Sequence, residues 1–560
     1  MRILLITPPL TQLNTPYPAT AYLKGLFAAQ GHEVHQLDLG IELADRVLSK
    51  EFLQSIGLER EAQLIEPVKR FLRGQDDTLG PRIANRSLLP EGKRFEQLDE
   101  DHLEWSFGVS GTTDKAQHLA TLFIEEVADY VREHVDEHFD LVRYAEYLSN
   151  DAPTFDPLYE ELQHEPSPID RLMISILEEK ISIFNFQFSI DRVCLTIPFP
   201  GCLYGALRCG QWFKANTKAT IELGGGFPNT EWRQMDEPRI YEFCDEVVID
   251  GHPEAIDHCP DFSDLPLDKY LSMSEMTNPM HRLWSQGRWN KMVMAQGCYW
   301  HRCAFCDTSL PYIGDYRAPK ASTVVDRMER VMEQTGRTGF HFVDEALPPK
   351  LLGEVAEEIL QRGLTLSFWG NIRFEKAYTA ELCDLLAEAG MVAVSGGLEV
   401  ASDRLLKLMD KGVTIQQTAE ACRHLRDAGI MVHTYLMYGF PTETLQETVD
   451  ALETVRRMFD EGIVQSAFWH RYAMTCHSPS GLHPEAFGAR RVTVDPNPFC
   501  NNEVDWEPID GGQQFDYDID AVGAALRLAT YNYMNGLGLE QPVRSWFPIR
   551  VPRPTQERKR

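Results

Sequence analysis

Three cysteines close together in the chain are the residues whose type and spacing most clearly indicate chemistry. Cys298, Cys303 and Cys306 lie within nine residues, directly after a predicted strand at residues 292–296. An iron-sulfur cluster takes soft thiolate ligands, and one short loop can present three of them to three corners of a cube. No fourth ligand is evident nearby. The pattern therefore predicts a [4Fe-4S] cluster with one iron open to a small chelating ligand.

A structural zinc site is the alternative for these thiols. Zinc prefers paired thiols and a fourth Cys or His that closes a tetrahedron. The chain has no second pair of cysteines at such spacing, although His301 is a possible fourth ligand. The other nine of the twelve cysteines are scattered, and many lie in apolar segments, which does not indicate a secreted disulfide framework. The open site favours the cluster over zinc.

The strand before the cysteines opens a regular series of strands and helices. Six strands are expected, near residues 292–296, 339–343, 366–370, 391–396, 431–437 and 466–471. Helices are expected between them. Six strand-helix units in sequence predict a partial or full β/α barrel over residues 291–484, with functional side chains at the carboxyl ends of its strands.

A second α/β series precedes the barrel. Its strands are expected at residues 3–7, 34–39, 192–198, 220–223 and 246–249. A helix that ends at Gly31 joins the first two of them, which is a βαβ opening. Between residues 41 and 180 charge and helical periodicity predict a helical insertion. Together these segments predict a parallel, doubly wound, Rossmann-like sheet over residues 1–256.

Two further segments complete the predicted organisation. Residues 257–290 contain several prolines and scattered aromatic residues, and we expect a linker there. Residues 485–560 form a C-terminal extension with Pro- and Asp-rich loops and one helix near residues 522–534. We assign no chemistry to this extension.

Length and charge narrow the classes of function. A chain of 560 residues is long enough for two or three domains, because single cores rarely exceed roughly 250 to 300 residues. The 54 basic against 84 acidic residues give a formal net charge of −30, which repels nucleic acid and anionic membrane surfaces. No signal peptide and no membrane span are evident. We expect a cytoplasmic protein without nucleic-acid or membrane partners.

At the cysteines the chain resembles the radical S-adenosylmethionine (radical SAM) superfamily. The usual pattern there is Cys-x3-Cys-x2-Cys, whereas this chain has Cys-x4-Cys-x2-Cys. The resemblance implies a [4Fe-4S] cluster on the three cysteines. Its open iron binds the amino and carboxylate groups of SAM and passes an electron to the sulfonium. Phe305, just before the third cysteine, fits the usual pattern and is implied to pack by the adenine.

Later segments extend the resemblance along the predicted barrel. Asp344 and Glu345 end the second strand, where relatives place an acidic or polar group against the SAM amino group. Arg373 ends the third, and the family directs such an arginine to the cofactor. Glu399 lies in a "GxEsgs"-like stretch and is implied to bind ribose hydroxyls, and Gly439 opens a "GxPgEt"-like end of the fifth strand. Each alone is equally an ordinary strand end or helix cap.

A Rossmann-like half, a linker and a radical SAM barrel together resemble cobalamin-binding-domain radical SAM proteins. The resemblance covers residues 1–40 and 190–480. It implies that cobalamin passes its nucleotide tail along the sheet edge at Thr196, Gly224, Gly225 and Gly226, where glycines let backbone approach a bulky ligand. The same glycines are compatible with a tight turn or a dinucleotide loop.

The chain lacks a histidine for cobalt at the expected place. Cobalamin enzymes of the mutase type offer one from an Asp-x-His-x-x-Gly stretch, and the comparable loop here is residues 38–43, with Gly40. Radical SAM relatives often lack the histidine too. The loop therefore fits cobalamin bound without a protein histidine, and equally a domain that has lost cobalamin.

The leading hypothesis is a radical SAM methyltransferase. It would abstract hydrogen from an unactivated carbon of a small-molecule substrate and use methylcobalamin to place a methyl group there, with electrons from an external donor such as flavodoxin or ferredoxin. The alternative keeps the radical and performs a rearrangement, oxidation or sulfur insertion without cobalamin. A binding protein without turnover is disfavoured, because a sensor needs no set of SAM contacts. The sequence does not indicate the substrate.

Overall fold

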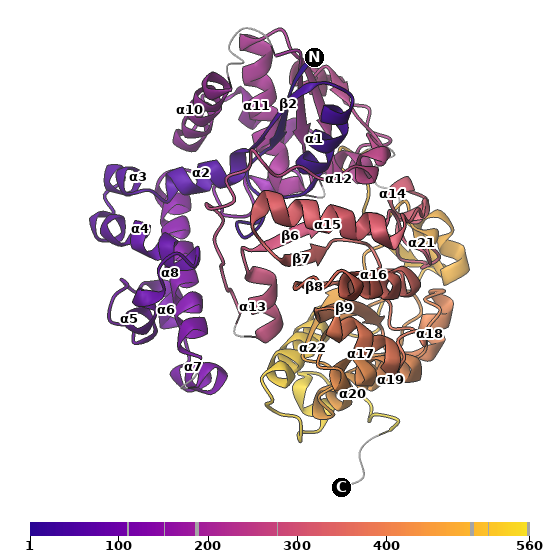
Figure 1. Ribbon diagram of the computed structural model, residues 1–560. Coiled ribbons are helices and arrows are strands. Elements are labelled where there is room, and N and C mark those ends of the chain that lie inside the picture. Colours follow the sequence, from indigo (N-terminus) through magenta and orange to yellow (C-terminus); the bar gives the residue numbers. More distant parts are fainter. Residues whose placement is uncertain are drawn as a thin grey trace. The chain divides into compact units, whose positions relative to one another are not determined.

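The structure is a computed structural model that describes residues 1–108, 111–150, 152–184, 190–276, 278–492, 498–512 and 514–556. The chain divides into two compact units, the first built mainly from residues 1–291 and the second mainly from residues 292–560. Each unit is organised around one large sheet (Figure 1). In the described ranges no helix is both long enough and apolar enough to cross a membrane.

The sheet of the first unit has five parallel strands in the order β2-β1-β3-β4-β5. The strands are β1 (Arg2–Thr7), β2 (Glu33–Asp38), β3 (Arg192–Thr196), β4 (Thr220–Gly224) and β5 (Glu246–Val247). Helices α1 (Ala19–Ala29) and α11 (Leu203–Asn216) form two of the crossovers that parallel neighbours need. From β1 the chain crosses to β2 on one side, and from β3 it crosses to β4 on the other side. The carboxyl ends of β1 and β3 therefore form the switch point of the sheet. The predicted Rossmann-like sheet is confirmed.

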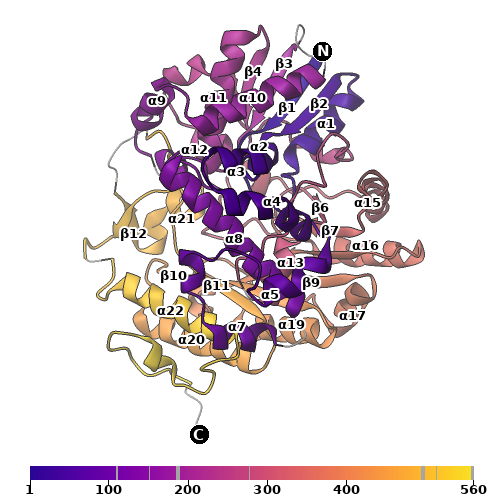
Figure 2. The ribbon, with the colours of Figure 1, turned by 90° about the vertical axis from the view of Figure 1, so that its left-hand side faces the viewer.

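The segment between β2 and β3 is helical, as the sequence predicts. It begins with α2 (Leu39–Val47), directly after β2, and ends with α10 (Pro168–Ile183). Its longest helix is α8 (Thr112–His134), which buries Leu119, Phe123 and Val127 in the same core as the sheet because residues four apart share a helix face. Four shorter helices contact α8: α4 (Glu59–Leu72), α5 (Gly80–Ala84), α6 (Lys93–Glu96) and α7 (Glu100–Phe107). Figure 1 labels all four, and Figure 2 shows α4, α5 and α7 around α8 from another side.

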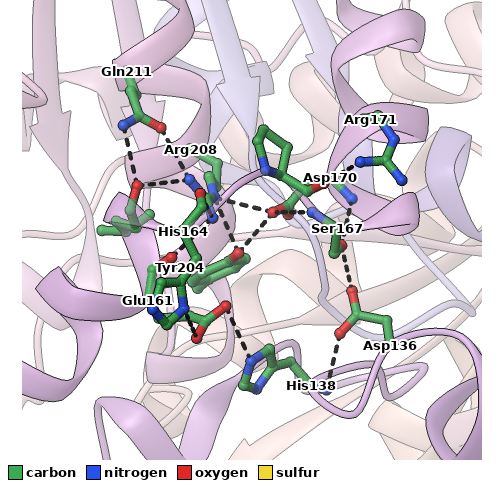
Figure 3. Close-up of polar contacts among 12 residues, drawn as sticks. Asp136, His138, Glu161, His164, Ser167, Asp170, Arg171, Tyr204, Arg208 and Gln211 are labelled. Carbon is green, nitrogen blue, oxygen red and sulfur yellow. Dashed lines mark hydrogen bonds and ion pairs between the residues drawn. The ribbon is translucent and has the colours of Figure 1, made fainter.

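A buried polar network connects α10 of the insertion to α11 of the sheet (Figure 3). Arg208 Nε lies 3.0 Å from Asp170 Oδ2, and the Tyr204 hydroxyl donates to the same oxygen at 2.7 Å. The two remaining guanidinium nitrogens donate to the carbonyls of Leu162 and Glu161 at 2.8 and 3.0 Å. Both charges are thus paired and hydrogen-bonded, which is the condition under which a protein interior tolerates an ion pair.

Residues 257–290, expected to be a linker, contain helix α13 (Pro279–Ser285) and lie in the first unit. Tyr270 is 3% exposed and is part of the apolar core of that unit. Its hydroxyl donates to the Asp38 carboxylate at 2.6 Å. The segment is therefore packed on the first unit along much of its length.

The sheet of the second unit has six strands in the order β11-β10-β9-β8-β7-β6, which is the order of the chain. The strands are β6 (Trp289–Met292), β7 (Gly339–Phe342), β8 (Ser367–Ile372), β9 (Met391–Glu399), β10 (Met431–Tyr438) and β11 (Ser466–Arg471). The helices between them include α15 (Ala321–Thr335), α16 (Pro349–Gln361), α17 (Ala380–Glu388), α19 (Ile415–Asp427) and α20 (Leu445–Asp460). Sequential strands with a helix after each confirm the predicted partial β/α barrel.

The first barrel strand ends earlier than the sequence predicts. We expected a strand near residues 292–296, whereas β6 ends at Met292. The N–H groups of Met294 and Ala295 donate to the Asp344 carboxylate at 2.8 and 2.7 Å. Because these two N–H groups donate to a side chain and not to a neighbouring strand, the strand pairing of β6 ends before them.

The C-terminal extension contains a short hairpin, β12 (Ala489–Arg491) with β13 (Trp506–Pro508), and helix α22 (Ile519–Met534). Helix α22 contacts β11, and the Trp469 indole N–H donates to the Thr530 hydroxyl at 2.8 Å. Helix α22 therefore packs along β11, an edge strand of the sheet.

Candidate active site

The cysteine loop, residues 297–307, follows β6 and is held by main-chain hydrogen bonds. The Cys298 N–H donates to the Ile313 carbonyl at 2.9 Å, and the Ala304 N–H donates to the Met409 carbonyl at 2.8 Å. Gly297 and His301 take positive φ angles of 69° and 37°. The course of the loop is therefore set both by its own turns and by the segment that follows helix α18 (Asp403–Leu408).

Two of the three thiols lie side by side. The Cys306 N–H donates to the Cys303 carbonyl at 3.2 Å, and Cys303 is 5% exposed. The neighbouring Cys306 thiol lowers the pKa of Cys303, against the effect of burial, and the positive charges of Lys411 and Arg373 lower it further. A lowered pKa favours the thiolate, the form of cysteine that binds metals.

Cys298 lies half-buried at the start of the same loop. Among the described residues, no group of three or more His, Cys, Asp or Glu side chains is placed to hold a metal ion. A cubane cluster carries its thiolates at separate corners, so its ligands need not converge on one point as the four ligands of zinc do. The assignment of all three cysteines to one cluster stays a prediction.

Asp344, predicted to contact SAM, follows β7 and is 2% exposed. Its two carboxylate oxygens accept the N–H groups of Met294 and Ala295, just before the cysteine loop. Burial raises the pKa of Asp344 to about 7, although these hydrogen bonds act in the opposite direction. The neighbouring Glu345 is an exposed residue, although desolvation by the surrounding protein raises the pKa of its carboxyl group. Asp344 thus supports the backbone that leads into the loop, and Glu345 is the carboxylate accessible to solvent.

Arg373 follows β8 and has protein partners for each of its guanidinium nitrogens. Nε donates to the Glu375 carboxylate at 2.8 Å, Nη1 donates to Cys303 Sγ at 3.6 Å, and Nη2 donates to the Lys411 carbonyl. The residue is 4% exposed. The structure therefore brings Arg373 to a predicted cluster ligand, where the sequence predicted a contact with SAM.

Glu399 ends β9 with a left-handed backbone, φ 58°, and is 6% exposed. Its carboxylate is paired with Lys411, whose Nζ lies 2.7 Å from Oε1. A Cβ at Gly397 would overlap this carboxylate, so a glycine there leaves room for it. Glu399, predicted to bind ribose, is thus held in place by a buried lysine.

The remaining SAM candidates lie on the same side of the barrel sheet. The Phe305 ring centroid is 5.4 Å from Lys411 Nζ, a cation-π contact. Gly439 follows β10 with φ 84°, and its N–H donates to the Glu443 carboxylate at 2.7 Å. Burial raises the pKa of Glu443 to about 7. The amide of Gly439 is therefore already used by the protein.

Three residues of this site were missed by sequence reasoning: Trp300, Glu375 and Lys411. Lys411 follows α18 and meets Glu399, at the end of β9, only when the chain between them is folded. Glu375 lies two residues after its partner Arg373, and no motif marked it. Trp300 carried a signal, since it is a large aromatic residue inside the cysteine loop, at the place where the loop is longer than usual.

The predicted cobalamin residues lie at the carboxyl ends of β3 and β4. Thr196 is 4% exposed and pairs with Gly224 across the two strands. A Cβ at Gly225, which has φ 113°, would lie 2.6 Å from the Ile197 carbonyl oxygen, and one at Gly226 would lie 2.9 Å from that of Pro198. At Gly224 the nearest atom would be 3.6 Å away, an ordinary contact. Close packing of the two loops thus requires glycine at positions 225 and 226, whereas position 224 has room.

The segment compared with a cobalt-binding loop is not a loop. Asp38 caps the amino end of α2, and its Oδ1 accepts the Ile41 N–H at 3.1 Å. Gly40 lies inside this helix. The expectation of a loop at residues 38–43 is therefore wrong, because an N-cap aspartate starts a helix directly after β2.

Comparison with known families identifies the second unit. Residues 292–455 match the family model "Radical SAM superfamily". These residues include the cysteine loop and β7 to β10. The matched part of the barrel is thus a radical SAM domain, as the resemblance of its motifs predicts.

Individual relatives match parts of the chain. An anaerobic magnesium-protoporphyrin IX monomethyl ester cyclase from Cereibacter sphaeroides is 33% identical over 172 residues, which cover 30% of this chain and 27% of the relative. A bacteriochlorophyllide d C-12(1)-methyltransferase from Chlorobaculum tepidum is 27% identical over 315 residues, which cover 50% of this chain and 65% of the relative. The chain spans less than two thirds of the length of either relative.

A solved structure is also similar. It is the radical S-adenosylmethionine methyltransferase TsrM from Kitasatospora setae with cobalamin and a [4Fe-4S] cluster bound, which matches with a TM-score of 0.47 and 15% identity over 92% of this chain and 83% of that chain.

Proposed function

We propose that this enzyme holds a [4Fe-4S] cluster on Cys298, Cys303 and Cys306. The observation that supports this most strongly is the buried Cys303 thiol, whose Sγ accepts from Arg373 Nη1 at 3.6 Å and which lies in the same short loop as Cys298 and Cys306. Arg373 donates to this thiol and so offsets part of the negative charge of a thiolate there, while Arg373 and Lys411 are themselves paired with Glu375 and Glu399. Three thiols on one loop match a cluster with an open iron, whereas a structural zinc site needs a fourth ligand.

A cluster with an open iron supplies one electron to the sulfonium of bound SAM, and the electron comes from an external donor such as flavodoxin or ferredoxin. We assign Phe305 to the adenine and Glu399, fixed by Lys411, to the ribose hydroxyls. Glu345, whose carboxylate is exposed, is assigned to the SAM amino group. Asp344 supports the backbone beneath these contacts.

We infer further that the first unit binds cobalamin and that the reaction methylates an unactivated carbon of a small molecule. A relative named as a methyltransferase covers half of the chain. The first unit also has the open parallel sheet whose strand carboxyl ends bind ligands in doubly wound folds. Thr196 and Gly224 lie at that edge, and Gly224 has room for a neighbouring group.

A radical reaction without cobalamin is the second candidate. It is favoured by the packing of Gly225 and Gly226, since the close approach of Ile197 and Pro198 explains both glycines without a ligand. In this case the first unit would serve another purpose, and the radical SAM domain would act alone.

Reconstitution separates the two candidates. The protein is purified without oxygen and supplied with iron and sulfide, with and without hydroxocobalamin, and is then examined by visible spectroscopy and by analysis of SAM products. We expect cluster absorption, bound corrinoid, and loss of the corrinoid alone in Gly224→Phe. A protein that takes up no corrinoid and still cleaves SAM at full rate would establish the second candidate.

A further inference from the structure

We propose that Trp300 is a positioning residue that anchors the cysteine loop, and that the longer first gap of the cysteine motif exists to carry it. The inference rests on the proposed cluster. Four residues, Tyr299 to Arg302, separate the first two cysteines, where the usual radical SAM pattern has three. The structure shows where this additional length goes.

The indole of Trp300 is seated between the loop and the segment after α18. Its N–H donates to the Asp410 carbonyl at 2.7 Å. The guanidinium carbon of Arg373 lies 4.5 Å from the Trp300 ring centroid, and that of Arg302 lies 5.1 Å from it. Arg302 is in turn paired with the Asp410 carboxylate at 3.0 Å. The ring thus has a hydrogen bond at its edge and two cation-π contacts.

Gly412 is the residue that makes this seat possible. A Cβ at position 412 would overlap the Trp300 ring. The ring is rigid, so the overlap cannot be relieved in the way that the end of a flexible side chain could move aside. Gly412 also has φ 75°, a conformation that L side chains rarely adopt. Both observations require glycine, and the first requires it because of Trp300.

Arg373 transmits the position of Trp300 to a predicted cluster ligand. The same guanidinium that lies over the indole donates to Cys303 Sγ and to the Lys411 carbonyl. Its partner Glu375 also accepts the Tyr299 hydroxyl at 2.7 Å. One arginine and its carboxylate therefore hold three residues of the loop: Tyr299, Trp300 and Cys303.

This arrangement has two consequences for a bound cluster. It places Cys303 in a fixed position relative to the rest of the loop before any metal arrives, which favours retention of iron. It also fixes a guanidinium beside one thiolate, and a positive charge there favours the reduced, more negative cluster. Loss of Trp300 should therefore loosen the cluster and shift its midpoint potential to a more negative value.

The test uses the full-length reconstituted protein and the variants Trp300→Ala, Trp300→Phe and Gly412→Ala. Arg423→Ala is the control, because the Arg423 side chain of α19 is 44% exposed and pairs with Glu461, which follows α20 in the same unit. Three quantities are measured: the rate of iron loss to a chelator, the electron paramagnetic resonance spectrum of the reduced cluster, and the midpoint potential in a redox titration.

We expect Trp300→Ala and Gly412→Ala to lose iron roughly tenfold faster than wild type, about the effect of losing one such contact, with an altered spectrum and a more negative potential. Trp300→Phe keeps a ring beside Arg373 and should therefore retain part of each property. This variant can be measured even if Trp300→Ala fails to fold. Wild-type values of all three quantities in Trp300→Ala would overturn this inference but not the proposed function. If Trp300→Ala does not fold, wild-type values in both Trp300→Phe and Gly412→Ala would have the same meaning. A wild-type protein that binds no cluster would overturn the proposed function as well.

Discussion

Single residues show that the charges around the cysteine loop are paired before any cofactor binds. Lys411 is 7% exposed and is neutralised by Glu399, while Arg373 is shared between Glu375 and the Cys303 thiol. Buried charges with such partners cost the fold little compared with unpaired ones. The site is therefore preorganised by its own ion pairs.

Asp344 gives a testable pH dependence at this scale. Its pKa is raised from 3.8 to about 7 by burial, so on a rise in pH the unfolded chain loses this proton before the folded chain does. The contribution of Asp344 to stability is therefore largest at low pH and is lost between about pH 4 and pH 7, by as much as about 4 kcal/mol. Asp344→Asn should lack this fall, because an amide does not ionise.

Urea unfolding of the cluster-free protein at about pH 5 and about pH 8 measures the effect. The expected result is a larger decrease in the free energy of unfolding for wild type than for Asp344→Asn. The same pH dependence in both proteins would show that Asp344 does not titrate with a raised pKa.

At the scale of elements, the loops after β3 and β4 touch so closely that two neighbouring glycines should behave differently. Gly225→Ala places a Cβ against the Ile197 carbonyl in a backbone with φ 113°, whereas Gly224→Ala meets only an ordinary contact. We expect Gly225→Ala to destabilise the first unit by about 1 to 3 kcal/mol and Gly224→Ala by less than about 1 kcal/mol. Urea unfolding of the first unit, monitored by limited proteolysis, measures the free energy of unfolding of both variants. Equal values would contradict the close contact of the two loops.

The elements were largely predictable from sequence, and the side-chain partners were not. Strands β7 to β11 and the helical insertion follow hydrophobic periodicity, a local property of the chain. Strand β6 was placed too late because the sequence does not reveal that Asp344, some fifty residues on, takes the N–H groups of Met294 and Ala295. Lys411 was missed for the same reason, since its partner Glu399 only becomes a neighbour when β9 and the segment after α18 are folded.

At the scale of the whole molecule, the helical insertion shares one apolar core with the first sheet and should unfold with it. Arg208→Met would leave the Asp170 carboxylate buried without its cation. We expect a loss of about 3 to 5 kcal/mol in the stability of the first unit, the usual cost of breaking a buried ion pair. Chemical unfolding monitored by limited proteolysis of each unit measures this loss of stability.

Arg46→Met is the matched control. Arg46 of α2 pairs with Glu179 of α10 at 2.9 Å, and both side chains are about half exposed, at 43% and 51%. Such a pair contributes at most about 1 kcal/mol. An Arg208 variant no less stable than the Arg46 variant would mean that the network in Figure 3 does not hold the insertion to the sheet.

The central claim for the molecule is that one loop of the radical SAM domain holds an iron-sulfur cluster through three thiolates. The most direct measurement is iron content and visible absorption of anaerobically reconstituted Cys298→Ala, Cys303→Ala and Cys306→Ala, beside Cys383→Ala, a buried cysteine of α17 outside the loop. Each loop variant should lose the cluster, because an iron is left without its protein ligand, and Cys383→Ala should keep it. Full iron content and unchanged cluster absorption in all three loop variants would contradict the claim.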